Sequence, residues 1–262
     1  MVKRSAKKPS WVIEREREGR GKGPERLWLF GLHAVRDALQ NPARQKFRLI
    51  VTKNAADRLG EALTAAELTP EVVDARQFKA PIDPQSVHQG AAMEVAPLDW
   101  GSVSERCAPG NSAPRVLLLD RVTDPHNIGA ILRSAEVFGA RAVIAPHRHS
   151  APETGALAKA ASGALERQPY LRVPNLANAM LSLRQMGYAI IGLDGTGDID
   201  LEPALTEVAG VPVALALGAE GPGLRELTRK TCDRLARIPS GGEFGSLNVS
   251  NAAAVALYAA RR

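Results

Sequence analysis

From Leu27 onward, short apolar runs alternate with stretches in which apolar residues recur every three or four positions. Continuous apolar runs of this length are typical of buried strands, and the three-to-four spacing is typical of amphipathic helices. We expect strands at 47–53, 71–75, 87–98, 115–122, 140–146, 170–174, 188–194, 211–218 and 233–239. We expect helices within 27–42 and at 56–68, 125–140, 153–165, 175–187, 223–232 and 246–261. The chain is therefore predicted to be an α/β protein.

The alternation is interrupted at 100–115, where Gly, Pro, Ser and Asn cluster without periodicity. This break predicts a small α/β domain at 27–99, a linker at 100–114 and a second domain at 115–262. In the second domain, helices and apolar strands follow one another strictly. That order favours a parallel sheet with helices on both faces.

Composition limits the class of protein. Hydrophobic residues make up 45% of the chain and charged residues 24%, as in a globular protein with a real core. No apolar run approaches the roughly 18 residues of a membrane span, and the N-terminus lacks the apolar segment of a secretory signal. Cys107 and Cys232 are far apart and belong to no cysteine motif, which favours unpaired thiols in a reducing cytoplasm. Their spacing is not that of metal ligands.

The net charge of +6 is concentrated at the N-terminus. Residues 1–26 hold nine Lys or Arg and four Glu, together with several glycines, so this segment carries most of the excess. It has too little apolar surface to fold alone. We expect a flexible basic arm able to contact phosphate backbones, or else a solvated tail with no partner.

Glycine-rich loops follow three strands of the second domain, at 195–198, 219–223 and 240–248. Ligands of open α/β sheets lie at the carboxyl ends of strands, so a binding site is expected there. The dinucleotide spacing GxGxxG, the phosphate loop GxxxxGK[ST] and the hydrolase motif GxSxG are absent from these positions. His147 and His149 have no third ligand at usable spacing, which favours a polar loop over a metal site.

Three segments resemble, in order, the three motifs of the SpoU (TrmH-like) RNA 2′-O-ribose methyltransferases of the SPOUT superfamily. They are NIGAILRSAEVFGA (127–140), LALGAEGPGL (215–224) and IPSGGEFGSLNVSNAAAVALY (238–258). In the first domain, FGLHAVRDALQNP and HQGAAMEVAPL are similar to the family's substrate-binding domain, which resembles ribosomal protein L30e. The basic arm and the linker lie outside the resemblance.

The resemblance implies a C-terminal SPOUT-type parallel sheet with a deep trefoil knot, preceded by an L30e-like domain. It implies S-adenosyl-L-methionine as methyl donor, no metal, and a homodimer that acts on RNA and not at a membrane. The cofactor is expected to contact Thr196, Gly197, Leu217, Gly218, Gly221, Ile238 and Leu247. The catalytic set implied is Asn127, Arg133, Glu220, Ser246 and Asn248.

The activity implied is 2′-O-methylation of a ribose, that of a guanosine in 23S rRNA. The alternatives are a tRNA ribose methyltransferase of the same family and a non-catalytic RNA-binding or ribosome-assembly factor. Arg133 is expected to clamp a phosphate, because a guanidinium with a pKa above about 12 is a poor base at neutral pH. Asn127 lies six residues before Arg133 and is expected to precede or cap the helix.

Overall fold

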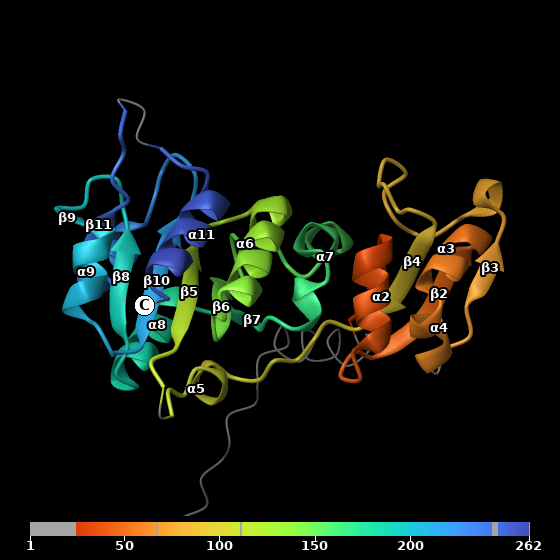
Figure 1. Cartoon of the computed structure of the whole chain (residues 1–262), viewed down its shortest axis with the longest axis horizontal. Helices are drawn as coiled ribbons and strands as arrows, with labels where there is room; N and C mark the ends of the chain where they lie inside the picture. Colours follow the sequence, from red (N-terminus) through yellow and green to blue (C-terminus); the bar gives the residue numbers. More distant parts are fainter. Residues whose placement is uncertain (1–24, 67, 111, 243–245, 262) are drawn as a thin grey trace, which may run out of the picture.

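The computed structural model describes residues 25–66, 68–110, 112–242 and 246–261, and the chain forms two α/β units (Figure 1). The basic arm expected at 1–26 lies outside the described residues, except for its last two positions. The smaller unit is N-terminal, and an extended segment crosses from it to the larger unit.

The N-terminal unit is a mixed four-stranded sheet in the order β1-β4-β2-β3. Strand β4 pairs antiparallel with both β1 and β2, and β3 pairs parallel with β2. The strands are β1 (Leu27–Phe30), β2 (Lys46–Thr52), β3 (Glu71–Val73) and β4 (Ala91–Val95). The helices are α2 (Leu32–Gln40), α3 (Lys53–Leu59), α4 (Glu61–Ala65) and the 3₁₀ turn η1 (Ala75–Gln77).

Two expected helices of this unit are divided by glycines. The stretch 27–42 forms strand β1 and then α2, with Gly31 between them at a φ of 93°. The stretch 56–68 divides into α3 and α4 at Gly60, which has a φ of 38°. Positive φ is open to glycine at little cost, so each glycine turns the chain where apolar spacing alone suggested one continuous helix.

The C-terminal unit is a seven-stranded sheet in the order β7-β6-β5-β10-β8-β11-β9, and every pairing in it is parallel. This confirms the expected parallel sheet. The strands are β5 (Arg115–Asp120), β6 (Ala142–Pro146), β7 (Tyr170–Val173), β8 (Ala189–Leu193), β9 (Ile199–Asp200), β10 (Val213–Gly218) and β11 (Arg234–Arg237). The short strand β9 and the helix after it were not expected from the sequence.

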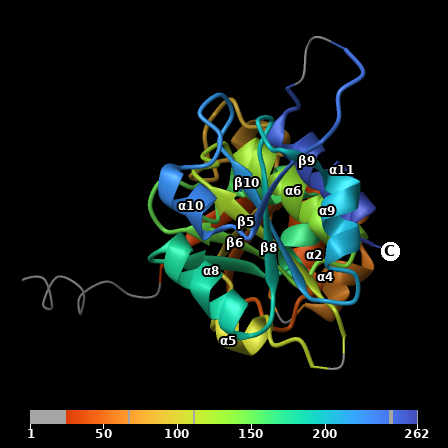
Figure 2. The ribbon, with the colours of Figure 1, turned by 90° about the vertical axis from the view of Figure 1, so that its left-hand side faces the viewer.

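Helices cover both faces of this sheet (Figure 2). One face carries α6 (Pro125–Val137), α9 (Leu201–Glu207) and α11 (Val249–Ala259); the other carries α5 (Val103–Arg106), α8 (Leu176–Gln185) and α10 (Glu226–Thr231). Helix α7 (Gly155–Ala161) packs against α6, on the side of the N-terminal unit (Figure 1). Strand β5 shows why two apolar cores form. Leu117 and Leu119 belong to one core, and Val116 and Leu118 belong to the other, because successive side chains point to opposite faces.

The expected linker contains one turn of helix, α5. Its N-cap Ser102 accepts a hydrogen bond from the Glu105 amide, and Glu105 accepts one from the Ser102 amide. Cys107 follows, fully buried in the core beneath α8, and its carbonyl accepts a 2.7 Å hydrogen bond from the Tyr188 hydroxyl. A capping box and a buried anchor thus order a segment whose composition suggested irregular chain.

Because all seven strands are parallel, their carboxyl ends meet along one edge of the sheet, where the glycine-rich loops lie. Among the described residues, no helix has the length and apolar content needed to cross a membrane.

Candidate active site

A cavity of about 530 Å³ opens at the carboxyl ends of β8, β10 and β11. Its size falls within the range of small-molecule sites, roughly 300–1,000 Å³. The three glycine-rich loops and the start of α11 form its wall. The residues of the expected site that line it are Thr196, Leu217, Gly218, Glu220, Gly221, Ile238, Ser246 and Leu247.

Gly197 is expected in the cofactor site, but it is not part of the cavity wall. It packs behind the loop, where an added Cβ would lie 2.7 Å from the carbonyl oxygen of Leu235. Its amide donates to Asp194, and its carbonyl accepts a 3.0 Å hydrogen bond from Arg237. Gly197 therefore supports the loop from outside the cavity.

The last residue of β10 has to be glycine because of the loop that follows it. Ala219 and Gly223 form an antiparallel bridge, in which the Gly223 amide donates to the Ala219 carbonyl over 2.9 Å. An added Cβ on Gly218 would lie 2.0 Å from the carbonyl carbon of Gly223. Gly221, at the tip, has a φ of 81°, which side chains rarely adopt. The loop folds back tightly enough to expose its backbone to the cavity.

Three side chains from three distant segments meet at one carboxylate oxygen. Oε1 of Glu220 accepts hydrogen bonds from Nδ2 of Asn127 over 3.1 Å and from Nδ2 of Asn248 over 2.6 Å. Asn248 also donates to Oδ1 of Asn127 over 3.0 Å. The three residues lie on α6, on the loop after β10 and at the entry to α11. Each fixes the orientation of the other two.

Asn248 is at the same time the N-cap of α11. Its Oδ1 accepts from the amide of Ser250 over 2.8 Å and from the Ser250 hydroxyl over 2.5 Å. One end of the amide group therefore begins the helix, and the other end joins the polar cluster. Ser246 lies two residues earlier, exposed in the cavity wall.

The expectation that Asn127 precedes or caps its helix is wrong. Asp124 caps α6 by accepting a 3.0 Å hydrogen bond from the His126 amide, and Pro125 takes the first helical position. Asn127 is thus inside the first turn. Its side chain is free to bind Glu220 and Asn248 because Asp124 already satisfies the helix end.

Arg133 is not brought into this cluster. It is exposed on α6, does not line the cavity, and makes no hydrogen bond or ion pair with any described residue. Six positions on a helix separate it from Asn127 by about nine ångströms along the axis and place it on a different side. Its guanidinium is available to a ligand from outside the chain.

An ion pair in the cavity wall was missed from the sequence. Asp194, at the end of β8, pairs with Arg229 and accepts hydrogen bonds from the amide and hydroxyl of Thr196 over 2.9 and 2.6 Å. Burial opposes ionisation, but the bonds from Thr196 and Arg229 outweigh it and lower the pKa of the carboxyl. The position of Asp194 directly after a buried strand was the available signal.

A buried carboxylate fixes the chain that leaves the loop after β10. Asp120, at the end of β5, is fully buried and lies beside Gly218 in the sheet. It accepts hydrogen bonds from the amide and Nε of Arg225 over 2.9 and 2.6 Å, and from the Thr228 hydroxyl over 2.6 Å. The chain leaving the loop is therefore tied to the sheet.

No three His, Cys, Asp or Glu side chains within the described ranges are grouped so that they could hold a metal ion. His147 and His149 lie in the turn after β6.

Two family models match the chain and together cover most of it. Residues 114–258 match the SpoU rRNA Methylase family, and residues 28–100 match the domain described as RNA 2′-O ribose methyltransferase substrate binding. The first match contains the cavity and the three polar residues. The second corresponds to the N-terminal sheet and its helices.

Curated relatives are similar over nearly their whole length. The chain is 37% identical over 249 residues to the 23S rRNA (guanosine-2′-O-)-methyltransferase RlmB of Vibrio vulnificus, covering 90% of this chain and 96% of that one. It is 41% identical over 239 residues to the enzyme of the same name from Ralstonia nicotianae, covering 89% and 94%.

Solved structures share the fold across both units. The SpoU methyltransferase AviRb from Streptomyces viridochromogenes, in complex with AdoMet, aligns with a TM-score of 0.75 at 24% identity, covering 95% of this chain and 92% of that one. A putative RNA methyltransferase of the TrmH family from Porphyromonas gingivalis aligns with a TM-score of 0.70 at 26% identity, covering 98% and 99%.

Proposed function

The chain belongs to the SpoU rRNA methylase family, and from that premise we propose that it methylates the ribose 2′-hydroxyl of a guanosine in 23S rRNA with S-adenosylmethionine. The observation that carries the proposal is the meeting of Asn127, Glu220 and Asn248 beside a cavity of suitable size. The relatives named 23S rRNA (guanosine-2′-O-)-methyltransferase are similar over about nine-tenths of the chain, which supports the same reaction and substrate.

S-adenosylmethionine would supply the methyl group, and the cavity suits it. Backbone groups of Gly218 and Gly221 face the cavity where no side chain obstructs them, and Leu217, Ile238 and Leu247 add apolar surface. We assign these five residues and Thr196 to the cofactor. Such a wall can hold a flat heterocycle by apolar contact and read its polar edge with backbone groups. Gly197 is assigned the supporting role described above.

The polar cluster and the hydroxyl of Ser246 are assigned to the ribose side of the reaction. A 2′-hydroxyl reacts at an appreciable rate only when it is held in line with the carbon it attacks. Glu220 fixes both asparagine side chains, so these groups need little rearrangement when RNA binds. A preorganised polar site of this kind lowers the barrier without reorganisation during the reaction.

Arg133 is assigned to the RNA phosphate next to the target ribose. Its guanidinium is exposed and has no partner among the described residues, so no ion pair has to break before it binds. A guanidinium stays protonated at neutral pH and offers two parallel donors to a phosphate. Its charge also stabilises the oxyanion that forms as the hydroxyl loses its proton.

We further propose the finer features of the family for this chain: the trefoil knot in the C-terminal unit, and an L30e-like RNA-binding domain at 27–99 joined by 100–114 to the catalytic domain at 115–262. The match of residues 114–258 to the SpoU rRNA Methylase family supports the knot. The substrate-binding match at 28–100 supports the role of the N-terminal domain.

A homodimer in the cytoplasm is part of the proposal. Apolar side chains are exposed near the contact of α6 with α11: Val137 is 71% exposed and Val255 42%. Phe138 and Tyr258 meet edge to face between the same helices, which places this surface at one site. A second copy would cover it.

Mapping of 2′-O-methyl groups across total RNA, with and without the gene product, tests the proposed function. One ribose methylation lost from a guanosine of 23S rRNA is the expected result. A site lost from tRNA instead would replace rRNA by tRNA as substrate. An unchanged map, together with no calorimetric binding of S-adenosylmethionine, would indicate a non-catalytic RNA-binding factor.

A further inference from the structure

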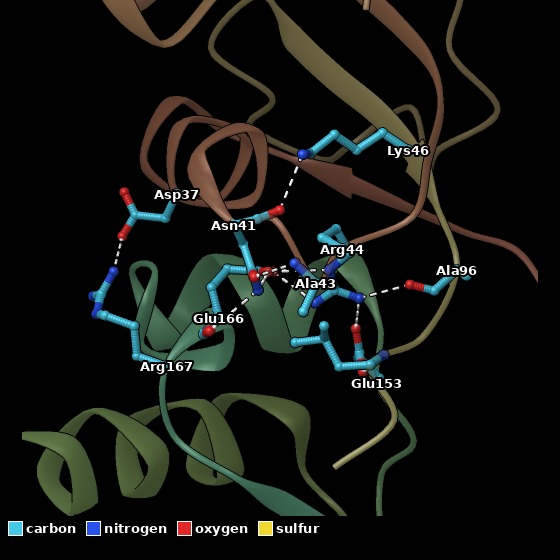
Figure 3. A network of polar contacts seen from close by, with 10 residues as sticks. Asp37, Asn41, Ala43, Arg44, Lys46, Ala96, Glu153, Glu166 and Arg167 are labelled. Carbon is cyan, nitrogen blue, oxygen red and sulfur yellow. Dashed lines mark hydrogen bonds and ion pairs between the residues drawn. The ribbon is translucent and has the colours of Figure 1, made fainter. Parts of the chain in front are cut away.

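A buried arginine joins the two units. Arg44 lies between α2 and β2 of the N-terminal unit, and its side chain is fully buried (Figure 3). Its Nε and Nη2 donate to the two carboxylate oxygens of Glu166 over 3.0 and 2.6 Å. Its Nη1 donates to the carbonyl of Ala96 over 2.7 Å and pairs with Glu153. Both glutamates belong to the C-terminal unit.

The two glutamates are held by further groups of the N-terminal unit. Asn41 donates to Oε2 of Glu166 over 2.9 Å and to its carbonyl over 3.2 Å. The amide of Leu98, on the segment that crosses between the units, donates to Glu153 over 3.2 Å. Burying a charge is strongly unfavourable unless the charge is paired and hydrogen-bonded. This cluster meets that condition only while the two units are docked.

The backbone of the C-terminal unit is shaped for the same contact. An added Cβ on Gly155, at the start of α7, would lie 2.4 Å from the carbonyl oxygen of Trp28. An added Cβ on Gly163 would lie 1.8 Å from Oδ2 of Asp37 on α2. Apolar residues of α2 and α7 belong to one continuous core. The docked arrangement is therefore built into packing as well as charge.

The contact between the two units, which α7 makes with α2 and β1, extends to α6, the helix that carries Asn127 and Arg133. An added Cβ on Gly129 of α6 would lie 2.5 Å from the Cβ of Ala160 on α7, so the two helices touch closely. Arg167 joins Asp37 of α2, over 2.6 Å, to Glu136 of α6. Glu136 is three residues from Arg133. A displacement of the N-terminal unit would therefore be transmitted to α6 through α7 and Arg167.

We infer that Arg44 is a positioning residue for methyl transfer: it fixes the RNA-binding unit on α7, and through α7 relative to Arg133 on α6. RNA held by the first unit then presents its ribose to the catalytic unit at a defined place. The inference rests on the proposed function. A docked unit gives the ribose a high effective concentration at the catalytic residues, and an undocked unit gives a far lower one.

The test variant loses a negative charge. A fall in its activity therefore cannot result from weaker electrostatic attraction between the protein and RNA. Glu166→Gln places an NH₂ group opposite the donors of Arg44 or Asn41 in a buried site. Glu71→Gln is the matched control. Glu71 also receives two hydrogen bonds from one arginine, Arg48, but the pair is half-exposed and lies within the N-terminal unit.

Three measurements are made on the full chain: hydrogen exchange at the Leu98 amide and across α7, calorimetric binding of S-adenosylmethionine, and kcat and KM with a 23S rRNA transcript, kcat being normalised to cofactor sites. For Glu166→Gln we expect exchange at least tenfold faster, cofactor Kd within twofold of wild type, KM within threefold and kcat at least tenfold lower. For Glu71→Gln all values are expected within twofold. Arg44→Lys keeps the charge but not the two-pronged contact, so its kcat should lie between those of Glu166→Gln and wild type.

Faster exchange with unchanged kcat would overturn the inference, and so would unchanged exchange in Glu166→Gln. If Glu166→Gln and Arg44→Lys both lose cofactor binding, Arg44 supports the fold as a whole and the positioning role is wrong. A wild-type chain that binds S-adenosylmethionine but does not methylate 23S rRNA would instead defeat the proposed function, which the exchange measurement does not require.

Discussion

Nδ2 of Asn248 donates a 2.6 Å hydrogen bond to Oε1 of Glu220, and the same oxygen also receives Nδ2 of Asn127. The carboxylate is thus the common acceptor for two side chains that come from other parts of the chain. Both bonds end on one oxygen, so the geometry of the cluster depends on an acceptor at that point more than on the negative charge.

Replacement of Glu220 separates these two roles. Glu220→Ala removes the acceptor and should lower kcat by about 100-fold, the scale seen when one preorganised polar group is lost. Glu220→Gln keeps a carbonyl oxygen that can occupy the Oε1 position, so its kcat should fall by less than about fivefold. The measurement is methyl transfer to an rRNA transcript at saturating cofactor.

Glu226→Ala is the control for Glu220, because Glu226 is an exposed acid on α10 whose partner is Lys230. It should retain wild-type turnover. If Glu220→Gln loses as much activity as Glu220→Ala, the negative charge is required and the acceptor argument fails.

Arg133→Ala should abolish methyl transfer, with a loss of at least about 100-fold, while the Kd for S-adenosylmethionine stays within twofold. Cofactor binding should persist because Arg133 lies outside the cavity wall and has no partner among the described residues, so its removal disturbs no contact of the fold. Arg133→Lys should fail similarly if two parallel donors to one phosphate are needed.

Arg234→Ala serves as a control for Arg133, because it removes another exposed arginine, which pairs with Glu207 and lies at the start of β11, the end of that strand away from the cavity. Turnover of this variant should match wild type. Wild-type-like turnover of Arg133→Ala would remove Arg133 from the active site.

Much of the sheet in the C-terminal unit was predictable from apolar runs. Strands such as β5 and β10 are buried on both faces, so they appear as uninterrupted apolar segments. Strand β1 was missed because Leu27–Phe30 joins the apolar spacing of α2 without a gap. The break is made by the positive φ of Gly31, which a pattern of apolar residues does not register.

The members of the polar cluster came from resemblance to a family, and their arrangement came from the structure. Asn127 lies 93 positions from Glu220, and no local spacing indicates that they share a hydrogen bond. Arg44 had no signal at all, because a single arginine in a polar turn resembles a surface residue. Its burial depends on two glutamates more than 100 positions away.

Gly218→Ala should weaken binding of S-adenosylmethionine at least about tenfold, because the new Cβ would meet the Gly223 carbonyl carbon at 2.0 Å and force the cavity loop to move. Gly155→Ala is a control that also forces a backbone clash. Its Cβ would lie 2.4 Å from the carbonyl oxygen of Trp28, at the contact between the two units and outside the cavity wall. Calorimetry should show weakened binding for Gly218→Ala only. Equal weakening in both would mean that general instability explains the effect.

Both thiols should be unreactive in the native protein at pH 8. Burial raises the pKa of Cys107 to about 11 and that of Cys232 to about 12, so almost no thiolate forms. Alkylation followed by mass spectrometry should be at least about 100-fold slower than in denaturant, where the pKa is near 8.5. The raised pKa values also make the free energy of unfolding depend on pH. Above about pH 8.5 the thiols ionise in the unfolded chain but not in the folded chain, so the folded state loses stability that it has at neutral pH. Rapid native labelling of either residue would contradict the burial.

Val255→Glu should convert the proposed dimer to a monomer. Val255 is 42% exposed on α11, and a second copy covering it would have to bury an unpaired carboxylate, at a cost of several kcal/mol. Each 1.4 kcal/mol is a factor of ten, so the dimer should weaken by about 100-fold or more.

Leu227→Glu is the control, because Leu227 is 61% exposed on α10, on the other face of the sheet. Light scattering should give twice the chain mass for wild type and Leu227→Glu, and a single chain mass for Val255→Glu. A wild-type chain that is monomeric at micromolar concentration would contradict the proposed dimer outright.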